Sequence, residues 1–239
     1  MSFHYSPRIV RDNSLVLYID VANNRSFVGG STNWYDLSGN NNTGTLNGLN
    51  GLPIYNNSNG GNISFDGTDD YVNLPNSTSL KPANPTLSMW IKPGITNKNQ
   101  FIFDGGYYNS VNGYLLYASS ANQFQFWIRN SSNNTQGVGV RTVTSTTVFD
   151  TSNWYNVTGI FDGSNVYIYV NGILENSAVM TNPINYASST NFWIGNYASV
   201  PGAGVNFQGD VSNMLLYNRA LSAAEVLQNY NAIKSRFGL

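Results

Sequence analysis

Hydrophobic and polar residues alternate along much of this chain, and a period of two residues predicts β-strands. For example, Phe124, Phe126 and Ile128 occupy every second position of their segment. Such runs are short and are separated by Gly, Asn or Pro, which is typical of a sandwich or barrel. The strands expected from this pattern are residues 15–19, 62–65, 71–74, 87–92, 101–103, 114–117, 124–128, 138–143, 154–160, 165–170, 191–194 and 211–217.

The clearest antiparallel pattern lies between residues 149 and 172. Two runs of apolar and aromatic residues are each followed by a dipeptide typical of tight turns, Asp162-Gly163 and Asn171-Gly172. Both dipeptides readily adopt the positive φ angles that hairpin turns require. The segment therefore predicts three strands joined by two turns.

Residues 20–61 lack such alternation and are rich in Gly and Asn. These residues favour turns and left-handed backbone conformations. We expect a long loop region here, with Trp34 and Tyr35 anchoring it to the sandwich.

One helix is expected at the C-terminus. Ser222 is a good N-cap, and Glu225 follows three residues later, as in a capping box. An apolar stripe at helical spacing follows, and Gly238 provides a stop signal. The stripe consists of Leu221, Val226, Tyr230 and Ile233.

No linker or long run of charge divides the chain, so we expect one β-sandwich with two terminal additions. Residues 1–14 form an N-terminal arm, residues 15–221 the sandwich, and residues 222–239 a helix packed on it. The arm carries Phe3 and Tyr5 but no core of its own. We expect the arm or the C-terminal tail to be an attachment segment; an extra edge strand is the alternative for the arm.

Composition limits the possible partners. Charged residues make up 10% of the chain, hydrophobic residues 41%, and the formal net charge is −1. Asn, Ser, Thr and Gly must therefore supply most of the polar surface. A surface with so little charge does not attract nucleic acid or anionic membranes, so we expect neither as a partner. Without cysteine, no disulfide and no thiolate metal site can form.

The N-terminal residues contain no apolar segment typical of a signal peptide, and no stretch has the length and hydrophobicity of a membrane span. We therefore expect synthesis in a cytoplasm without export by a signal peptide. Release by lysis would suit such a protein.

Four segments resemble motifs of one family. They are F-D-G-T-D-D-Y-V at 65–72, T-L-S-M-W-I-K-P at 86–93, W-Y-N-V with the following D-G and Y-V-N-G at 154–172, and Y-N-R-A-L-S at 217–222. In this order they are similar to the LamG-like branch of the concanavalin A-like lectin/glucanase superfamily. The resemblance covers roughly residues 15–232 and implies a two-sheet antiparallel jelly-roll sandwich.

A narrower resemblance involves Y-I-D at 18–20, W-Y-D-L-S-G-N at 34–40 and the tail 227–239. These segments are similar to tailed-phage virion proteins that carry this domain. The resemblance implies a virion surface protein, either a capsid decoration or a fibre component with a lectin-like, glycan-binding sandwich. Its partners would be other virion proteins, copies of itself and host or environmental glycans. The alternatives are a cellular carbohydrate-binding module and a glycan hydrolase or lyase of the same fold.

The residues needed for hydrolysis are absent from the sequence pattern. Hydrolase relatives of this fold carry E-x-D-x-x-E on one strand, whereas the glutamates here are the isolated Glu175 and Glu225. A serine triad needs a histidine base, and the one histidine is His4 in the arm. We therefore expect no catalytic residues and no enzymatic activity.

Asp66, Asp69 and Asp70 form the densest acidic group. Carboxylates can hold Ca²⁺, but aspartates in a turn also accept hydrogen bonds from backbone N–H groups. We favour the turn, because many family members have aspartate where this chain has Ser212, and that aspartate is the better candidate ligand. We therefore expect no metal or other cofactor.

Glycan recognition requires aromatic faces that stack on sugar rings and amides that bind hydroxyl groups. The predicted binding residues are Tyr107, Tyr108, Asn109, Asn130 within the stretch 130–136, Asn196 and Tyr197. The alternative is that these tyrosines pack at the rims of the sandwich. We expect the five tryptophans, Trp34, Trp90, Trp127, Trp154 and Trp193, in the core or at its edges.

Overall fold

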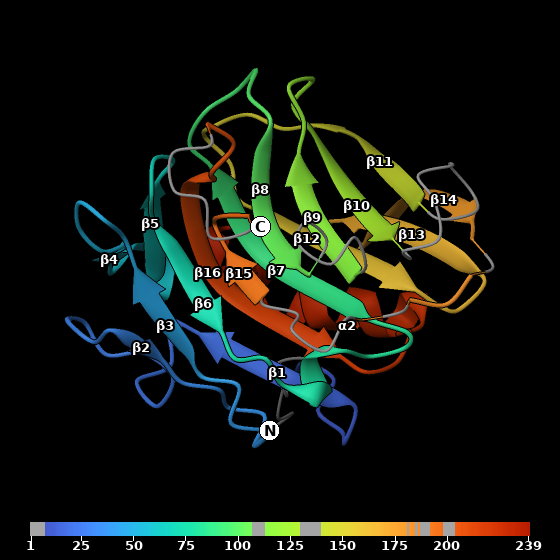
Figure 1. The fold of residues 1–239 in the computed structure, drawn as a ribbon, viewed down its shortest axis with the longest axis horizontal. Coiled ribbons are helices and arrows are strands. Elements are labelled where there is room, and N and C mark those ends of the chain that lie inside the picture. The colour runs from blue at the N-terminus through green and yellow to red at the C-terminus, as the bar shows by residue number, and fades with distance from the viewer. Residues whose placement is uncertain are drawn as a thin grey trace, which may run out of the picture.

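The computed structural model describes residues 8–106, 113–129, 140–180, 182–184, 186, 192–197 and 204–239. Within these residues, the chain forms two antiparallel β-sheets that pack face to face, with a helix from the C-terminal end (Figure 1). This confirms the predicted all-β sandwich with a C-terminal helix.

Eight strands form one sheet, here called sheet A. They are β1 (Leu15–Asp20), β4 (Ile54–Asn56), β5 (Asn62–Asp66), β7 (Thr86–Pro93), β12 (Tyr155–Phe161), β13 (Asn165–Val170), β14 (Ile173–Val179) and β16 (Gln208–Tyr217). Their order is β14-β13-β12-β7-β16-β5-β4, and β1 also pairs with β16. Strands β12, β13 and β14 are the predicted meander.

The opposing sheet, here called sheet B, also has eight strands. They are β2 (Asn33–Trp34), β3 (Gly44–Asn47), β6 (Tyr71–Leu74), β8 (Gln100–Gly105), β9 (Gly113–Ala118), β10 (Gln123–Arg129), β11 (Val140–Val148) and β15 (Phe192–Ile194). Their order is β11-β10-β9-β8-β15-β6-β3-β2. Strands distant in the sequence are therefore neighbours, as in a jelly roll.

The main hydrophobic core lies between the two sheets. Met89 and Val157 of sheet A and Phe103 and Phe126 of sheet B are fully buried in it. The two sheets approach closely at Gly159 of β12, where a Cβ atom would overlap the Phe126 ring. Glycine at this position thus leaves room for a large aromatic side chain.

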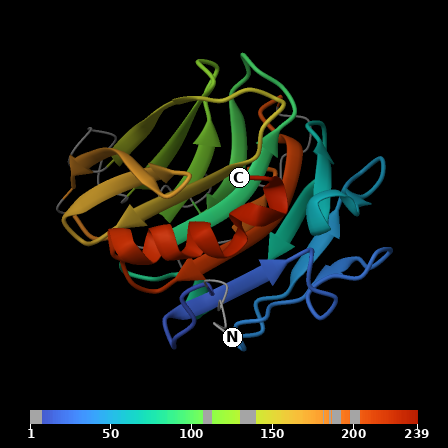
Figure 2. The ribbon, with the colours of Figure 1, turned by 180° about the vertical axis from the view of Figure 1, so that it is seen from behind.

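The C-terminal helix α2 (Ala223–Ile233) lies across the outer face of sheet A and continues into the short 3₁₀ helix η3 (Lys234–Phe237) (Figure 2). The predicted capping box is confirmed: Ser222 accepts a hydrogen bond from the Glu225 N–H, and Glu225 accepts one from the Ser222 N–H. Trp90 of β7 stacks on Phe237, with ring centroids 4.4 Å apart. Two further 3₁₀ turns are η1 (Ser58–Gly60) and η2 (Thr78–Leu80).

Residues 8–14, the described part of the predicted arm, lie against α2 and β16. The Val10 N–H donates to Asn229 Oδ1 at 2.7 Å, and the Tyr217 hydroxyl donates to the Val10 carbonyl at 2.8 Å. Val10 is buried together with Leu15 and Tyr217. These contacts fix the backbone that precedes β1.

Three strands were not predicted from the sequence. Strands β2, β3 and β4 fall within the region expected to be a loop, whereas β14 follows the Asn171-Gly172 turn as the third strand of the predicted meander. The first three have at most four residues each, too few to show a clear alternation. Strand β14 has exposed or half-buried residues throughout, so it has no apolar face to reveal its period. Among the described helices, none combines the length and hydrophobicity needed to cross a membrane.

Candidate functional site

Strands β8, β9 and β10 build the candidate site on the outer face of sheet B. In β10, Phe124, Phe126 and Ile128 point into the core, so the residues between them face outward. Trp127 is paired with Leu115 of β9 across the sheet. Directly opposite residues of an antiparallel pair share one face, so both side chains project from the outer side.

Three aromatic rings and one aliphatic side chain line a small, open cavity on this face. Phe101, Leu115, Tyr117 and Trp127 line it, and its volume is about 120 Å³. The rings of Phe101 and Tyr117 meet edge to face with centroids 5.0 Å apart, and those of Tyr117 and Trp127 are 6.2 Å apart. We call these four residues the aromatic face; its rings offer apolar surface to the C–H groups of a sugar.

Polar groups adjoin the aromatic face. The Trp127 Nε1–H donates to Gln125 Oε1 at 3.0 Å, and Gln125 Nε2 donates to Thr144 Oγ1 at 3.2 Å. The Gln125 amide is therefore held in one orientation. A fixed amide beside aromatic rings can exchange hydrogen bonds with sugar hydroxyl groups.

Tyr197, one of the predicted binding residues, joins this surface. Its ring stacks on Phe101 with a centroid distance of 4.7 Å and an interplanar angle of 19°. Asn196 is fully buried, and its Oδ1 accepts a hydrogen bond from the Tyr197 N–H at 2.6 Å. Asn196 thus positions Tyr197 rather than facing solvent.

The other predicted binding residues, Tyr107, Tyr108, Asn109 and Asn130, lie outside the described residues, as does the rest of 130–136. For Phe101 and Tyr117 the sequence pattern predicts only strands, and for Trp127 a place in the core or at its edges. The alternation in β10 could have identified Trp127 as a binding residue, because it places Trp127 on the sheet face opposite to that of Phe126. The other four tryptophans are buried, as expected.

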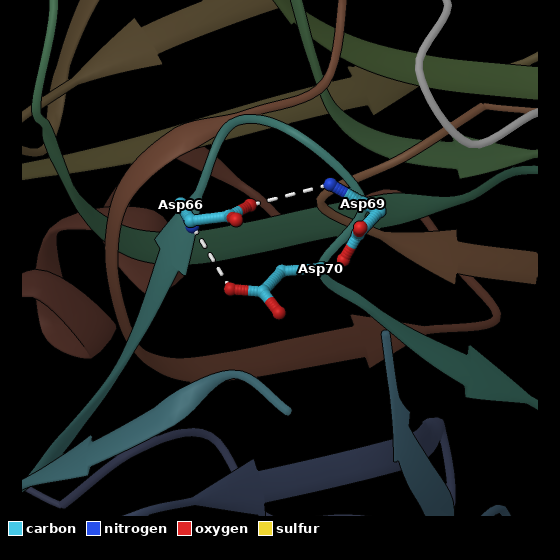
Figure 3. Close-up of side chains that lie close together, drawn as sticks. All are labelled: Asp66, Asp69 and Asp70. Carbon is cyan, nitrogen blue, oxygen red and sulfur yellow. Dashed lines mark hydrogen bonds between the residues drawn. The ribbon is translucent and has the colours of Figure 1, made fainter. Parts of the chain in front are cut away.

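The acidic group lies on the turn between β5 and β6 (Figure 3). Asp66 Oδ1 accepts hydrogen bonds from the Thr68 and Asp69 N–H groups at 2.7 and 3.3 Å. Asp70 Oδ2 accepts one from the Asp66 N–H at 2.9 Å. The aspartates therefore stabilise the turn, in the arrangement expected from the sequence.

These carboxylates also have the spacing of a cation site, because one oxygen of each lies within 4.8 Å of the others. However, both Asp69 oxygens already accept hydrogen bonds, from the Leu49 N–H at 3.1 Å and from Asn50 Nδ2 at 2.5 Å. The pKa of Asp70 is raised to about 6, mainly by burial. The hydrogen bond from the Asp66 N–H lowers this pKa, and the neighbouring carboxylates of Asp66 and Asp69 raise it. Ser212 is not part of the turn: its hydroxyl donates to the Gly61 carbonyl and accepts from Arg236.

The strands of sheet B contain a single acidic residue, Asp104 of β8. It is fully buried and pairs across the sheet with Leu115 and Trp193. Glycoside hydrolysis requires two carboxyl groups about 5–10 Å apart around the sugar bond. The described part of this face does not provide such a pair.

A family model agrees with this architecture. The model described as the concanavalin A-like lectin/glucanases superfamily matches residues 66–227. A comparison with curated proteins gave no match.

Solved structures also share the fold. Domain 4 of AbnA, an extracellular arabinanase from Geobacillus stearothermophilus solved with arabinotriose, superposes with a TM-score of 0.69 at 18% identity, covering 91% of this chain and 98% of that domain. The binding domain of botulinum neurotoxin serotype D/C gives 0.69 at 16% identity and that of Paraclostridial Mosquitocidal Protein 1 gives 0.69 at 14%. Both comparisons cover 92% of this chain and 52% of the toxin chain, so this chain spans about half of each toxin domain.

Proposed function

Because the chain belongs to the concanavalin A-like lectin/glucanases superfamily, we propose that it is a non-enzymatic glycan-binding protein. The observation that carries this proposal is the aromatic face on the outside of sheet B. The rings of Tyr117 and Trp127 stack on a sugar, and the Gln125 amide binds its hydroxyl groups.

The binding role is favoured over hydrolysis by the residues of sheet B. Asp104 has no second carboxylate on the described strands of this face, so no acid–base pair is available there. Stacking and hydrogen bonding to a neutral sugar need no ion. The proposed binding therefore requires no cofactor.

The proposed location is the surface of a tailed-phage virion, as a capsid decoration or a fibre component. The resemblance of residues 18–20, 34–40 and 227–239 to such proteins supports it. Partners would be other virion proteins and further copies of this chain, since virion components follow the symmetry of their mount. Mass spectrometry and immunogold labelling of purified particles test this location, and absence from every virion would end it.

A cellular carbohydrate-binding module is the second candidate. It is favoured by the likeness to domain 4 of the arabinanase, which this chain covers almost completely. A module of this kind would be found attached to an enzyme. The gene context and the mass of the native protein distinguish this candidate from the virion component.

A glycan array with matched variants tests the binding role. Trp127→Ala and Phe101→Ala remove stacking surface and should each weaken glycan binding at least about tenfold. Tyr35→Ala is the control, because Tyr35 is an exposed tyrosine away from the aromatic face. Tyr107→Ala and Tyr108→Ala test the binding residues predicted from the sequence.

Two outcomes of the array contradict the proposal. Equal binding by wild type and Trp127→Ala would exclude the aromatic face. No binding to any glycan, together with strong self-association, would favour a purely structural decoration. Turnover of a β-glucan or alginate that is lost when one aspartate is changed would show an enzyme instead.

A further inference from the structure

A second and larger cavity lies on the other side of the molecule, between the N-terminal segment, β1 and the C-terminal tail. Its volume is about 630 Å³, which is in the range of small-molecule sites. It is lined by Arg8, Ile9, Arg11, Tyr18, Asp20, Ala232, Ile233 and Arg236. None of these residues belongs to the aromatic face.

The charges on this lining are predominantly positive. Arg236 forms a two-pronged ion pair with Asp20, at 2.9 and 3.1 Å, and also donates to the Ser212 hydroxyl at 3.0 Å. The Tyr18 hydroxyl donates to the same carboxylate at 3.1 Å. Among the described lining residues, the one acid is therefore neutralised by one of the three arginines.

The guanidinium groups of Arg8 and Arg11 form no ion pair among the described residues. Arg11 donates one hydrogen bond to the Leu37 carbonyl at 3.2 Å. The Arg8 guanidinium has no ion-pair or hydrogen-bond partner among the residues that the structure describes. Both side chains are exposed, so an incoming anion need not displace an existing ion pair.

The backbone that carries these two arginines is held in place. The Arg8 carbonyl accepts a hydrogen bond from Gln228 Nε2 at 2.8 Å, and Val10 is bonded to Asn229 and Tyr217. A guanidinium group on a fixed backbone loses less freedom when it binds, and its planar fork matches a carboxylate.

We propose that this cavity binds the carboxylate of an acidic sugar unit. Arg8 and Arg11 would hold the carboxylate, and the Tyr18 hydroxyl would bind a ring hydroxyl group. Ile9, Ala232 and Ile233 provide apolar walls for the sugar ring. A cavity of about 630 Å³ has room for one or two sugar units. The inference rests on the proposed glycan-binding function, to which it adds a site for charged units.

Calorimetry on the full chain tests the site with four probes: trigalacturonate, its methyl ester, sialyllactose and lactose. At least one acidic probe should bind, and its uncharged counterpart should bind at least about tenfold more weakly. The double variant Arg8→Gln/Arg11→Gln should lose at least about tenfold in affinity for the acid. Lys92→Gln/Lys98→Gln is the charge-matched control, because it also removes two positive charges and neither lysine lines this cavity or the aromatic face.

The other outcomes contradict either this inference or the place of the ligand on the molecule. The cavity would be excluded as the carboxylate site if the acid and its uncharged counterpart bound equally. Unchanged affinity of the double arginine variant would exclude it as well. Binding of the acid that is lost in Trp127→Ala but kept in the arginine variant would move the ligand to the aromatic face, leaving the proposed function intact. If neither acidic probe binds but neutral glycans still do, this inference alone is wrong. If pentaglutamate competes equally well with the acidic probe, the ligand of the cavity is an acidic peptide.

Discussion

The carboxyl group of Asp70 is almost fully buried beside two other carboxylates, and burial is the main reason why its pKa rises to about 6. The folded protein therefore binds a proton at Asp70 at pH values where the unfolded chain has already lost it. Where the folded state holds more protons, the free energy of unfolding decreases as pH rises. Ionisation of Asp70 should thus reduce stability between about pH 4 and 6.

Asp70→Asn should remove this cost. The amide oxygen can still accept the hydrogen bond from the Asp66 N–H, but no buried charge forms. We expect the variant to be more stable than wild type by about 1 kcal/mol at pH 7 and equal to it near pH 4. Urea unfolding at the two pH values measures the difference, and a loss of stability at pH 7 would contradict it.

The same variant tests the acidic turn as a metal site. Without a bound cation, millimolar Ca²⁺ should leave the melting temperature of wild type unchanged. Stabilisation of wild type by Ca²⁺ that disappears in Asp70→Asn would instead show that Asp66, Asp69 and Asp70 hold the ion.

Gly159 is a second position where a small substitution should change the stability of the fold. An added Cβ would overlap the Phe126 ring across the core. We expect Gly159→Ala to cost about 1–3 kcal/mol in urea unfolding, as overpacked cores do. Phe126→Leu in the same chain should recover part of the loss, and purely additive effects would show that the two residues do not compete for space.

At the scale of elements, the start of α2 depends on a small polar network. Ser222 and Glu225 cap the helix reciprocally, and Arg219 joins Glu225 at 2.6 Å to Asp12 at 2.9 Å. The hydrogen bonds that Glu225 accepts from Arg219 are the main reason why the pKa of the Glu225 carboxyl group falls to about 2. The network thus connects the helix start to the segment before β1.

Ser222→Ala should lower the free energy of unfolding by about 1 kcal/mol, because the Glu225 N–H loses its acceptor. Ser235→Ala is the matched control: Ser235 is exposed in η3, and its hydroxyl makes no hydrogen bond among the described residues. Thermal unfolding of the two variants gives the comparison. Equal stability of both would mean that the cap contributes nothing.

Elements with a strong local signal were predictable from the sequence. Alternation identified strands such as β10, and the Ser222 cap identified α2, because each signal lies within one short segment. Strands β2, β3 and β4 were not predictable in this way, and β14 was expected only from the turn before it. These four strands are short or lack an apolar face, and pairing with the adjoining strands determines their conformation.

The candidate site was less predictable than the fold. Tyr197 was identified from its type and loop position, but its partner Phe101 is almost a hundred residues earlier in the chain. The aromatic face combines β8, β9 and β10, whose register is set by tertiary pairing. The large cavity is likewise formed by residues from both ends of the chain, so no local sequence pattern could predict it.

At the scale of the whole molecule, the two candidate sites belong to opposite surfaces of the sandwich. The aromatic face uses the outside of sheet B, whereas the arginine-lined cavity lies where the chain ends meet β1, beside sheet A. Helix α2 packs on the outer face of sheet A over β7, β12 and β16, so the central part of this face is not available as a second open binding sheet (Figure 2). The C-terminal segment therefore both closes the sandwich and completes the cavity.

Deleting residues 222–239 should consequently destabilise the entire molecule. The deletion uncovers Trp90 and Trp154, whose rings now lie 4.4 and 4.6 Å from that of Phe237. Exposed apolar surface of this kind promotes association, so we expect lower solubility, a lower melting temperature and red-shifted tryptophan fluorescence. Deleting only Gly238 and Leu239, which are exposed, is the control and should change none of these. Phe237→Ala leaves the helix intact and should shift the fluorescence partway, whereas unchanged stability and solubility after the long deletion would show that α2 does not support the sandwich.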